Sequence, residues 1–262
     1  MPGFILSALF GALLSGISLA VFAPYVTLRR ISYMGEALSH IAFAGIAIAI
    51  ITGINLTLGA FVFVSAVALG ISWLAKRHKI QEANTITIFL SLSMALGIIL
   101  ISLSRNYTFD LSSYLFGNVL LISSTELWAL GILNVLNIAF VLFFYKELFY
   151  LSYNAEMSKV FRIPTRAVDK LFYLLLAANI VFNLKSAGII LVTAQLILPA
   201  VIAFNLVRKL HTAIIAAVLV AIVSALIGFA LSFALNLPTG ATIVICQASL
   251  YAFSFVFRRR IS

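Results

Sequence analysis

The sequence has few charged residues and a single cysteine. Asp, Glu, Lys and Arg make up 9% of its 262 residues, and 64% of the residues are hydrophobic. Soluble globular domains carry about 25% charged residues, so this composition excludes a soluble domain. The only cysteine, Cys246, lies in an apolar run. Neither a disulfide framework nor a cysteine-based metal site is therefore available.

Common catalytic and nucleotide-binding motifs are also absent. The chain has no Gly-x-x-x-x-Gly-Lys-Ser/Thr phosphate loop, no Gly-x-Ser-x-Gly elbow and no His-Glu-x-x-His helix. Nothing in the sequence supports an enzyme. The net charge is +10, and the Lys and Arg residues occur in groups of one to three at the ends of apolar runs, without a basic stripe. This distribution argues against nucleic-acid binding.

The chain is instead built from apolar runs of roughly 20 residues, the length that a helix needs to cross a bilayer. Runs of this length favour helices over barrel strands, because a helix satisfies its own backbone hydrogen bonds in lipid. We predict one all-α membrane domain over residues 1–262, with nine spans and, as the alternative, eight. The predicted spans are residues 3–25, 28–51, 58–75, 85–103, 127–148, 168–184, 187–207, 212–235 and 241–256.

The positive charges between these runs predict an orientation. With nine alternating spans and a cytoplasmic C-terminus, 15 of the 17 Lys and Arg residues fall inside, and only Arg105 and Lys185 fall outside. This asymmetry is the one that the positive-inside rule describes. We therefore expect a multi-pass protein whose C-terminus is cytoplasmic.

Two connecting segments are longer than the others. Residues 104–126 carry aromatic side chains typical of a membrane interface. Residues 145–170 are basic and are interrupted by Pro164, which predicts a short helix, a break and a new helix that starts near Thr165. Inside the seventh span, Pro199 predicts a kink.

The second span contains an ionisable pair, Glu36 and His40. Four residues apart on a helix, these side chains project from the same face. An ionisable group at membrane depth costs about 2.5–3.5 kcal/mol on insertion scales, so such groups are functional by default. A carboxylate and an imidazole suit Zn, Mn or Fe, and a second copy of the helix across a two-fold axis would add two more ligands. The alternative is a polar pair that joins helices by hydrogen bonds.

Other polar residues are weaker candidates. His78 and His211 lie in basic turns, where solvated roles are expected. Six polar side chains within later predicted spans either line a conduit or form interhelical hydrogen bonds, and the second reading is favoured: Asn134, Asn137, Asn179, Asn183, Thr193 and Gln195. The spacing of Gly45 and Ala49 predicts close helix packing.

Four segments resemble one family. The stretch LRRISYMGEALSHIAFAGIA is similar to the second-helix signature Arg-Arg…Met-Gly-Asp-Ala-Leu-Ser-His-Ala…Gly of bacterial zinc, manganese and iron ABC transporter permeases, the ABC-3 family. Three further segments resemble that family's Leu-Phe-Gly-Asp-Ile-Leu, Gly-x-x-Leu-x-x-x-Leu-Leu-x-x-Pro-Ala and Pro-Ser-Gly-Pro-x-Ile-Val segments, in the family's order. They are SYLFGNVLLIS (Ser113 to Ser123), SAGIILVTAQLILPAVIA (Ser186 to Ala203) and LPTGATIVI (Leu237 to Ile245).

The resemblance implies a type II ABC importer-like permease in the bacterial cytoplasmic (inner) membrane. It implies a homodimer, a separate cytoplasmic ATPase subunit and an extracytoplasmic metal-binding protein, with Zn, Mn or Fe as transported substrate and no permanently bound cofactor. The family's metal-path residues map onto Glu36 and His40. A coupling helix that docks on the ATPase maps onto the loop at about 150–166, at Asn154, Ala155, Glu156, Met157, Ser158, Lys159, Val160, Phe161, Arg162 and Ile163.

Three residues depart from the family's pattern. Glu36 replaces the usual Asp, Asn118 replaces another Asp, and Arg162 stands where a Gly often precedes Ile. The first two bear on the identity of the metal and the third on docking. Two rival readings stay open at this point. One is a self-sufficient proton-coupled transporter that uses Glu36 and His40 as a proton relay, and the other is a membrane scaffold that transports nothing.

Overall fold

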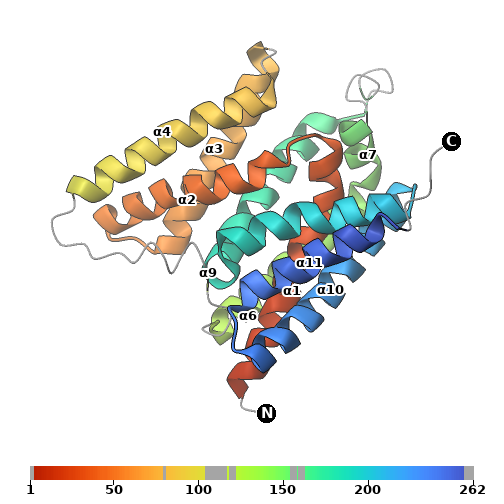
Figure 1. Ribbon diagram of the computed structural model, residues 1–262. Coiled ribbons are helices and arrows are strands. Elements are labelled where there is room, and N and C mark those ends of the chain that lie inside the picture. The colour runs from red at the N-terminus through yellow and green to blue at the C-terminus, as the bar shows by residue number, and fades with distance from the viewer. Residues whose placement is uncertain are drawn as a thin grey trace.

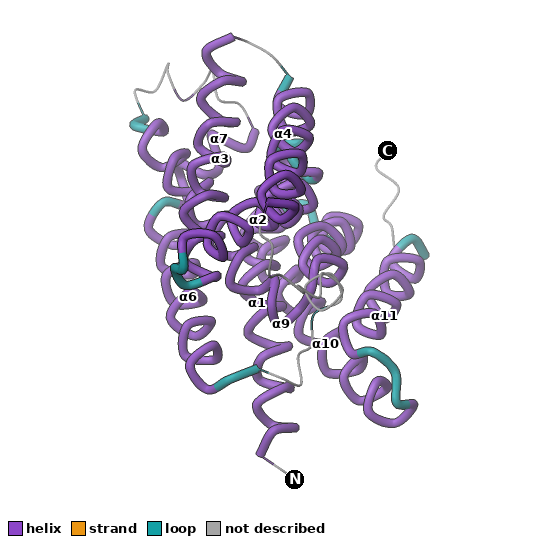
Figure 2. The backbone as a smooth tube through the Cα atoms, turned by 90° about the vertical axis from the view of Figure 1, so that its left-hand side faces the viewer, coloured by secondary structure: helices purple, strands orange, loops and turns teal. Residues whose placement is uncertain are grey.

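The computed structural model describes residues 3–78, 81–103, 117, 122–153, 158 and 163–256. Throughout that part of the chain every regular element is a helix, as predicted (Figures 1 and 2). The helices are α1 (Gly3–Leu28), α2 (Tyr33–Thr52), α3 (Leu56–His78), α4 (Glu82–Leu103), α6 (Ser124–Phe143), α7 (Tyr145–Tyr153), α9 (Thr165–Leu206), α10 (Leu210–Leu235) and α11 (Thr239–Ser254).

Helix α9 is the longest element and is broken in the middle. Its 42 residues would span roughly 63 Å as a straight helix, about twice the hydrocarbon thickness of a bilayer. At Gly188 the backbone is non-helical, with φ 75° and ψ 164°, and the two limbs diverge from this point (Figure 1). The limbs correspond to the predicted sixth and seventh spans. The break is therefore at Gly188, whereas the backbone at Pro199 stays helical.

The described helices follow the nine predicted spans in order. Seven of them are long and apolar enough to cross a membrane, one being the two-limbed α9, and α11 is a shorter apolar helix. Most boundaries differ from the prediction by one to five residues, and the fifth span differs at both ends. Helix α6 starts at Ser124, where Ser123 and Glu126 form a reciprocal capping box, and it ends at Phe143. The last predicted residues of the fifth span therefore belong to α7. Helix α9 starts at Thr165, as predicted.

Helix α9 lies at the centre of the bundle and contacts α1, α2, α3, α6, α7, α10 and α11. Aromatic rings fill the space between its first limb, α1 and α6. The ring centroid of Phe22 lies 5.2 Å from that of Phe172 and 6.2 Å from that of Phe140. All three side chains are buried. Large rigid rings at this junction fix the distance between the three helices.

Helices α2, α3 and α4 form a group on one side of the bundle (Figure 1). Small residues allow α2 and α3 to cross closely. A Cβ atom added at Gly45 would lie 2.7 Å from Ala60 Cα, and one added at Gly59 would lie 2.6 Å from Ala49 Cβ. The predicted close packing at Gly45 and Ala49 is thus confirmed. Within lipid, such contacts replace the hydrophobic effect as the force between helices.

Buried amides also join helices. Asn137 Nδ2 donates to Asn179 Oδ1 at 2.7 Å and Asn179 Nδ2 donates to Asn137 Oδ1 at 3.1 Å, while Ser18 of α1 bonds to both. Gln247 Nε2 of α11 donates to Gln195 Oε1 of α9 at 2.8 Å. The interhelical hydrogen-bond reading is confirmed at these positions. Thr193, by contrast, donates within α9, to backbone oxygens of the preceding turn.

Two sequence predictions fall mostly outside the described residues. Of the interfacial segment, the structure describes Gly117 and the residues from Ile122 onward. Of the ten predicted coupling residues it describes Ser158 and Ile163. The remaining eight, and Asn118, lie outside the described part.

Gly117 packs directly on the break in α9. It has a φ of 60°, and a Cβ atom at this position would meet the backbone nitrogen of Gly188 and lie 2.7 Å from its Cα. Both the positive φ and the close contact therefore require glycine at position 117.

We expect Gly117→Ala to lower the free energy of unfolding of the detergent-purified protein by about 1–3 kcal/mol from backbone strain alone. Gly131→Ala is the matched control, because nothing lies within 4 Å of its added Cβ. Equal melting curves for both variants would contradict this account.

Candidate functional site

Helix α2 carries the predicted pair on one face. Glu36 is exposed and His40 is half-buried, and Tyr33 continues the same stripe one turn earlier. The opposite face is buried against the second limb of α9. A Cβ atom at Gly35 would lie 2.6 Å from Leu196 Cδ2. Close packing at Gly35 thus sets the rotation of α2 and turns Glu36 and His40 away from the core.

The pair has no partner within the described part of the chain. Neither Glu36 nor His40 makes a hydrogen bond or an ion pair there. Between them, Ser39 is buried and donates to the carbonyl of Gly35 at 2.8 Å. The described part of one chain thus gives no support to the reading of a pair that joins helices. An exposed carboxylate on an apolar helix needs water, an ion or another subunit.

One chain supplies only two such ligands. The described residues contain no group of three or more His, Cys, Asp or Glu side chains that could hold a metal ion. Glu126 is held by Lys185 at 2.6 Å. His78 and His211 are exposed at other helix ends, as expected for solvated residues. A closed four-ligand site of the structural zinc type is therefore not formed by the described side chains of a single chain.

A buried ion pair lies at the other end of the α1–α2 turn. Arg29 Nη2 donates to Asp169 Oδ1 of α9 at 2.6 Å, with 7% and 2% of the two side chains exposed. The guanidinium carbon lies 4.7 Å from the Phe172 ring centroid and 5.0 Å from that of Tyr173. Ser72 of α3 donates to Asp169 Oδ2 at 3.1 Å. This pair joins α1, α3 and α9.

Sequence reasoning missed this network. In the sequence analysis Arg29 is one of the basic residues between spans that predict the orientation, and Asp169 is not among the candidate residues. Asp169, like Glu36, is a carboxylate within an apolar helix. The available signal was a single acidic residue inside the predicted sixth span, after which the sequence has no further Asp or Glu.

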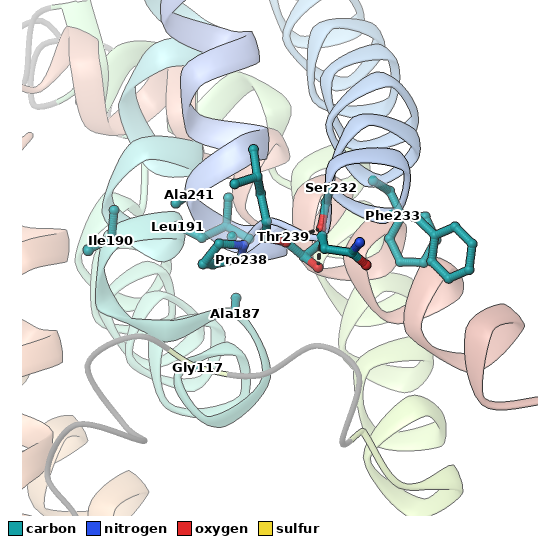
Figure 3. Close-up of a pocket in the computed structure, with 13 residues that line it drawn as sticks. Gly117, Ala187, Ile190, Leu191, Ser232, Phe233, Pro238, Thr239 and Ala241 are labelled. Carbon is teal, nitrogen blue, oxygen red and sulfur yellow. Dashed lines mark hydrogen bonds between the residues drawn. The ribbon is translucent and has the colours of Figure 1, made fainter.

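A cavity of about 490 Å³ lies beside the break in α9 (Figure 3). It is lined mainly by apolar side chains, and Ser232 Oγ and Thr239 Oγ1 form a 2.9 Å hydrogen bond at its edge. Three of the four motif segments that the sequence singles out meet here, through Gly117, Ala187 and Pro238. Among the described residues that line the cavity none is ionisable and none belongs to α2.

These features define a class of protein. Apolar helices packed through small residues and buried amides make a polytopic membrane protein. One of those helices carries an ionisable pair with no partner in the described part of the chain. The molecule is thus a multi-span membrane protein, and comparison with known proteins places it in a family.

The model of the ABC 3 transport family matches residues 1–258. The manganese transport system membrane protein MntC of Listeria innocua is 38% identical over 255 residues, which cover 97% of this chain and 91% of that protein. The high-affinity zinc uptake system membrane protein ZnuB of Haemophilus influenzae is 29% identical over 257 residues, 97% of this chain and 98% of that protein. The solved structure of PsaBC from Streptococcus pneumoniae in complex with Fab superposes with a TM-score of 0.83 at 30% identity, covering 96% of this chain and 91% of that chain.

The chain belongs to the ABC 3 transport family. The match extends over almost the whole length, so it includes all four motif segments and the α2 pair. The resemblance drawn from the sequence is confirmed, as is the assignment to a transport subunit rather than an enzyme.

Because Glu36 and His40 make no hydrogen bond or ion pair in the described part of the chain, their replacement by glutamine should leave folding intact. We expect the double variant Glu36→Gln/His40→Gln to melt within error of the wild-type protein in detergent without added metal. Asn137→Ala is the comparison, since it removes a fully buried amide bonded to Asn179 and Ser18. That variant should lose about 1–3 kcal/mol. A large loss of stability in the double variant would show that the pair is structural.

Proposed function

We propose that this chain is the permease subunit of an ABC importer that carries a divalent transition-metal ion into the cytoplasm. The observation that carries the proposal is the open pair of Glu36 and His40 on α2, in a chain that belongs to the ABC 3 transport family. Relatives named for manganese and for zinc transport support the class of ion. They point to two different metals, so the proposal is for the class.

The chemistry of the pair fits a transported ion. A carboxylate oxygen and an imidazole nitrogen suit Mn, Fe and Zn. Two ligands from one chain hold an ion weakly, and a second copy related by a two-fold axis would complete the site. Modest affinity is what transport requires, because an ion that is bound too tightly cannot leave. The metal is thus substrate and not a resident cofactor.

The proposed partners follow from the family. A separate cytoplasmic subunit would hydrolyse ATP, and an extracytoplasmic metal-binding protein would deliver the ion. In this arrangement the end of the molecule with Arg29 and Asp169 faces the cytoplasm, together with the C-terminus, as the distribution of Lys and Arg predicts. The segment from Asn154 to Ile163 would dock on the ATPase.

Transport would proceed by alternating access. Closure of the ATPase dimer would displace the docking segments and change the side of the membrane to which Glu36 and His40 are open. Membership of an ABC family gives no support to the rival reading of a self-sufficient transporter with a proton relay. That rival predicts uptake without an ATPase, driven by a pH gradient alone.

The test is metal uptake by cells that lack their own importer and receive this chain, its ATPase and its binding protein. We expect uptake of at least one of Mn, Zn and Fe, and a fall of roughly tenfold or more in His40→Ala and in Glu36→Ala, as expected when ligand binding energy is lost. His211→Ala is the matched control, because it removes an exposed histidine outside the pair.

Membrane levels of each variant are measured in parallel, so that loss of protein is not read as loss of transport. Uptake that persists in the double variant Glu36→Ala/His40→Ala would show that the metal path does not use this pair on α2. No ATP-dependent uptake of any of the three ions by the wild-type system would overturn the importer proposal itself.

A further inference from the structure

We infer that the buried ion pair of Arg29 and Asp169 is the link through which the ATPase-docking segment moves helix α2. This inference rests on the proposed function and assigns a positioning role to two residues that touch neither the ion nor ATP. It joins three pieces of structure that are far apart in the sequence: the start of α9, the turn between α1 and α2, and the C-terminal part of α3.

The docking side of the link runs from Ser158 to Asp169. Ser158 is 2% exposed and its Oγ lies 3.4 Å from Thr165 Oγ1. The backbone N–H of Ile163 donates to the Ser158 carbonyl at 2.9 Å, and that of Thr165 donates to the Ile163 carbonyl at 2.8 Å. Asp169 follows Thr165 by one helical turn. A displacement of Ser158 is thus passed to the first turns of α9.

The other side of the link runs from Arg29 to the metal pair. The turn that carries Arg29 is short, and its backbone forms hydrogen bonds with the last turn of α1. The N–H of Arg29 donates to the Tyr25 carbonyl at 3.0 Å, and that of Ile31 donates to the Val26 carbonyl at 3.1 Å. Arg30 adopts a φ of 58°, a conformation that non-glycine residues rarely take. Helix α2 starts two residues after Ile31, so only a short hydrogen-bonded turn lies between Arg29 and the helix that carries Glu36.

The pair itself is held from several directions. Tyr173 Oη accepts from Arg29 Nη2 at 3.2 Å, and Ser72 Oγ donates to the second carboxylate oxygen of Asp169. Through Ser72 the link also reaches α3, which crosses α2 at Gly45. A buried ion pair is weak support for stability, since apolar side chains of similar volume often do as well. Fixed geometry between α9 and the α1–α2 turn accounts better for this pair.

The test separates coupling from stability by removing both charges together. Arg29→Met/Asp169→Asn removes both charges of this ion pair, so that neither of the two is left buried without the other, and the fold should persist. The permease–ATPase complex in proteoliposomes, supplied with its metal-binding protein and the metal identified by uptake, is assayed for ions moved per ATP hydrolysed. We expect this ratio to fall roughly fivefold or more, the range of ordinary coupling energies. Arg29→Lys retains the ion pair and should keep most of the ratio.

Asn137→Ala is the control for buried polar contacts in general. It breaks a fully buried hydrogen-bonded cluster among α1, α6 and α9, away from the α1–α2 turn. It should lower stability yet leave the ratio of ions to ATP unchanged. A fall in that ratio equal to that of the double variant would show that general loosening, and not the ion pair, is responsible.

A second readout follows α2 directly. Tyr33 is 43% exposed on the face of Glu36, and Cys246 is the only native cysteine. In a Tyr33→Cys/Cys246→Ser background, the rate of thiol labelling at position 33 should change severalfold when ATP is added. The change should vanish when Arg29→Met/Asp169→Asn is present. Labelling that responds equally to ATP in both backgrounds overturns the link.

The outcomes also separate this inference from the proposed function. If the wild-type complex moves no metal, the importer proposal fails. If it moves metal and the double variant keeps the wild-type ratio, only the link fails. Should the double variant not assemble, Ser72→Ala/Tyr173→Phe removes two hydrogen bonds that orient the pair while both charges stay. An unchanged ratio and unchanged labelling in that variant would then overturn the link.

Discussion

Burial of charge in an apolar helix bundle is the constraint on which this structure depends. An ionisable side chain within such a bundle must be paired, hydrated or bound to an ion, because its isolated charge is too costly. Arg29 and Asp169 meet the constraint by pairing with each other, with Ser72 and Tyr173 supplying further hydrogen bonds. Glu36 and His40 meet no partner in the described part of the chain. That contrast separates a structural charge from one that is available to a ligand.

The bundle around these charges is held by contacts that do not depend on water. Small residues let α2 and α3 approach at Gly45 and Gly59, and buried amides such as Asn137 and Asn179 join helices. The hydrophobic effect gives little preference between helix and lipid, so packing and hydrogen bonds decide which faces meet. Closely packed small residues also leave each helix one favourable rotation. This explains how contact at Gly35 is enough to turn Glu36 outward.

Much of the fold could be predicted from the sequence, because span length and proline position act locally. The nine apolar ranges, the start of α9 after Pro164 and the shared face of Glu36 and His40 follow from such local rules. The contacts between distant segments do not. These helices are apolar on every side, so periodicity does not reveal which face is buried. The pairing of Arg29 with Asp169, 140 residues away, and the contact of Gly117 with Gly188 therefore had no sequence signal beyond residue type.

Transport requires two kinds of charged group with opposite demands. Ligands for a moving ion must change their exposure, and so cannot be locked to their own chain. A contact that passes motion between segments must stay closed while both sides move. In the mechanism that we propose, one of each kind lies near the start of helix α2, with the fixed Arg29 before its first turn and the open Glu36 seven residues later. A rigid turn between them lets a displacement at the fixed charge become a change of exposure at the open one.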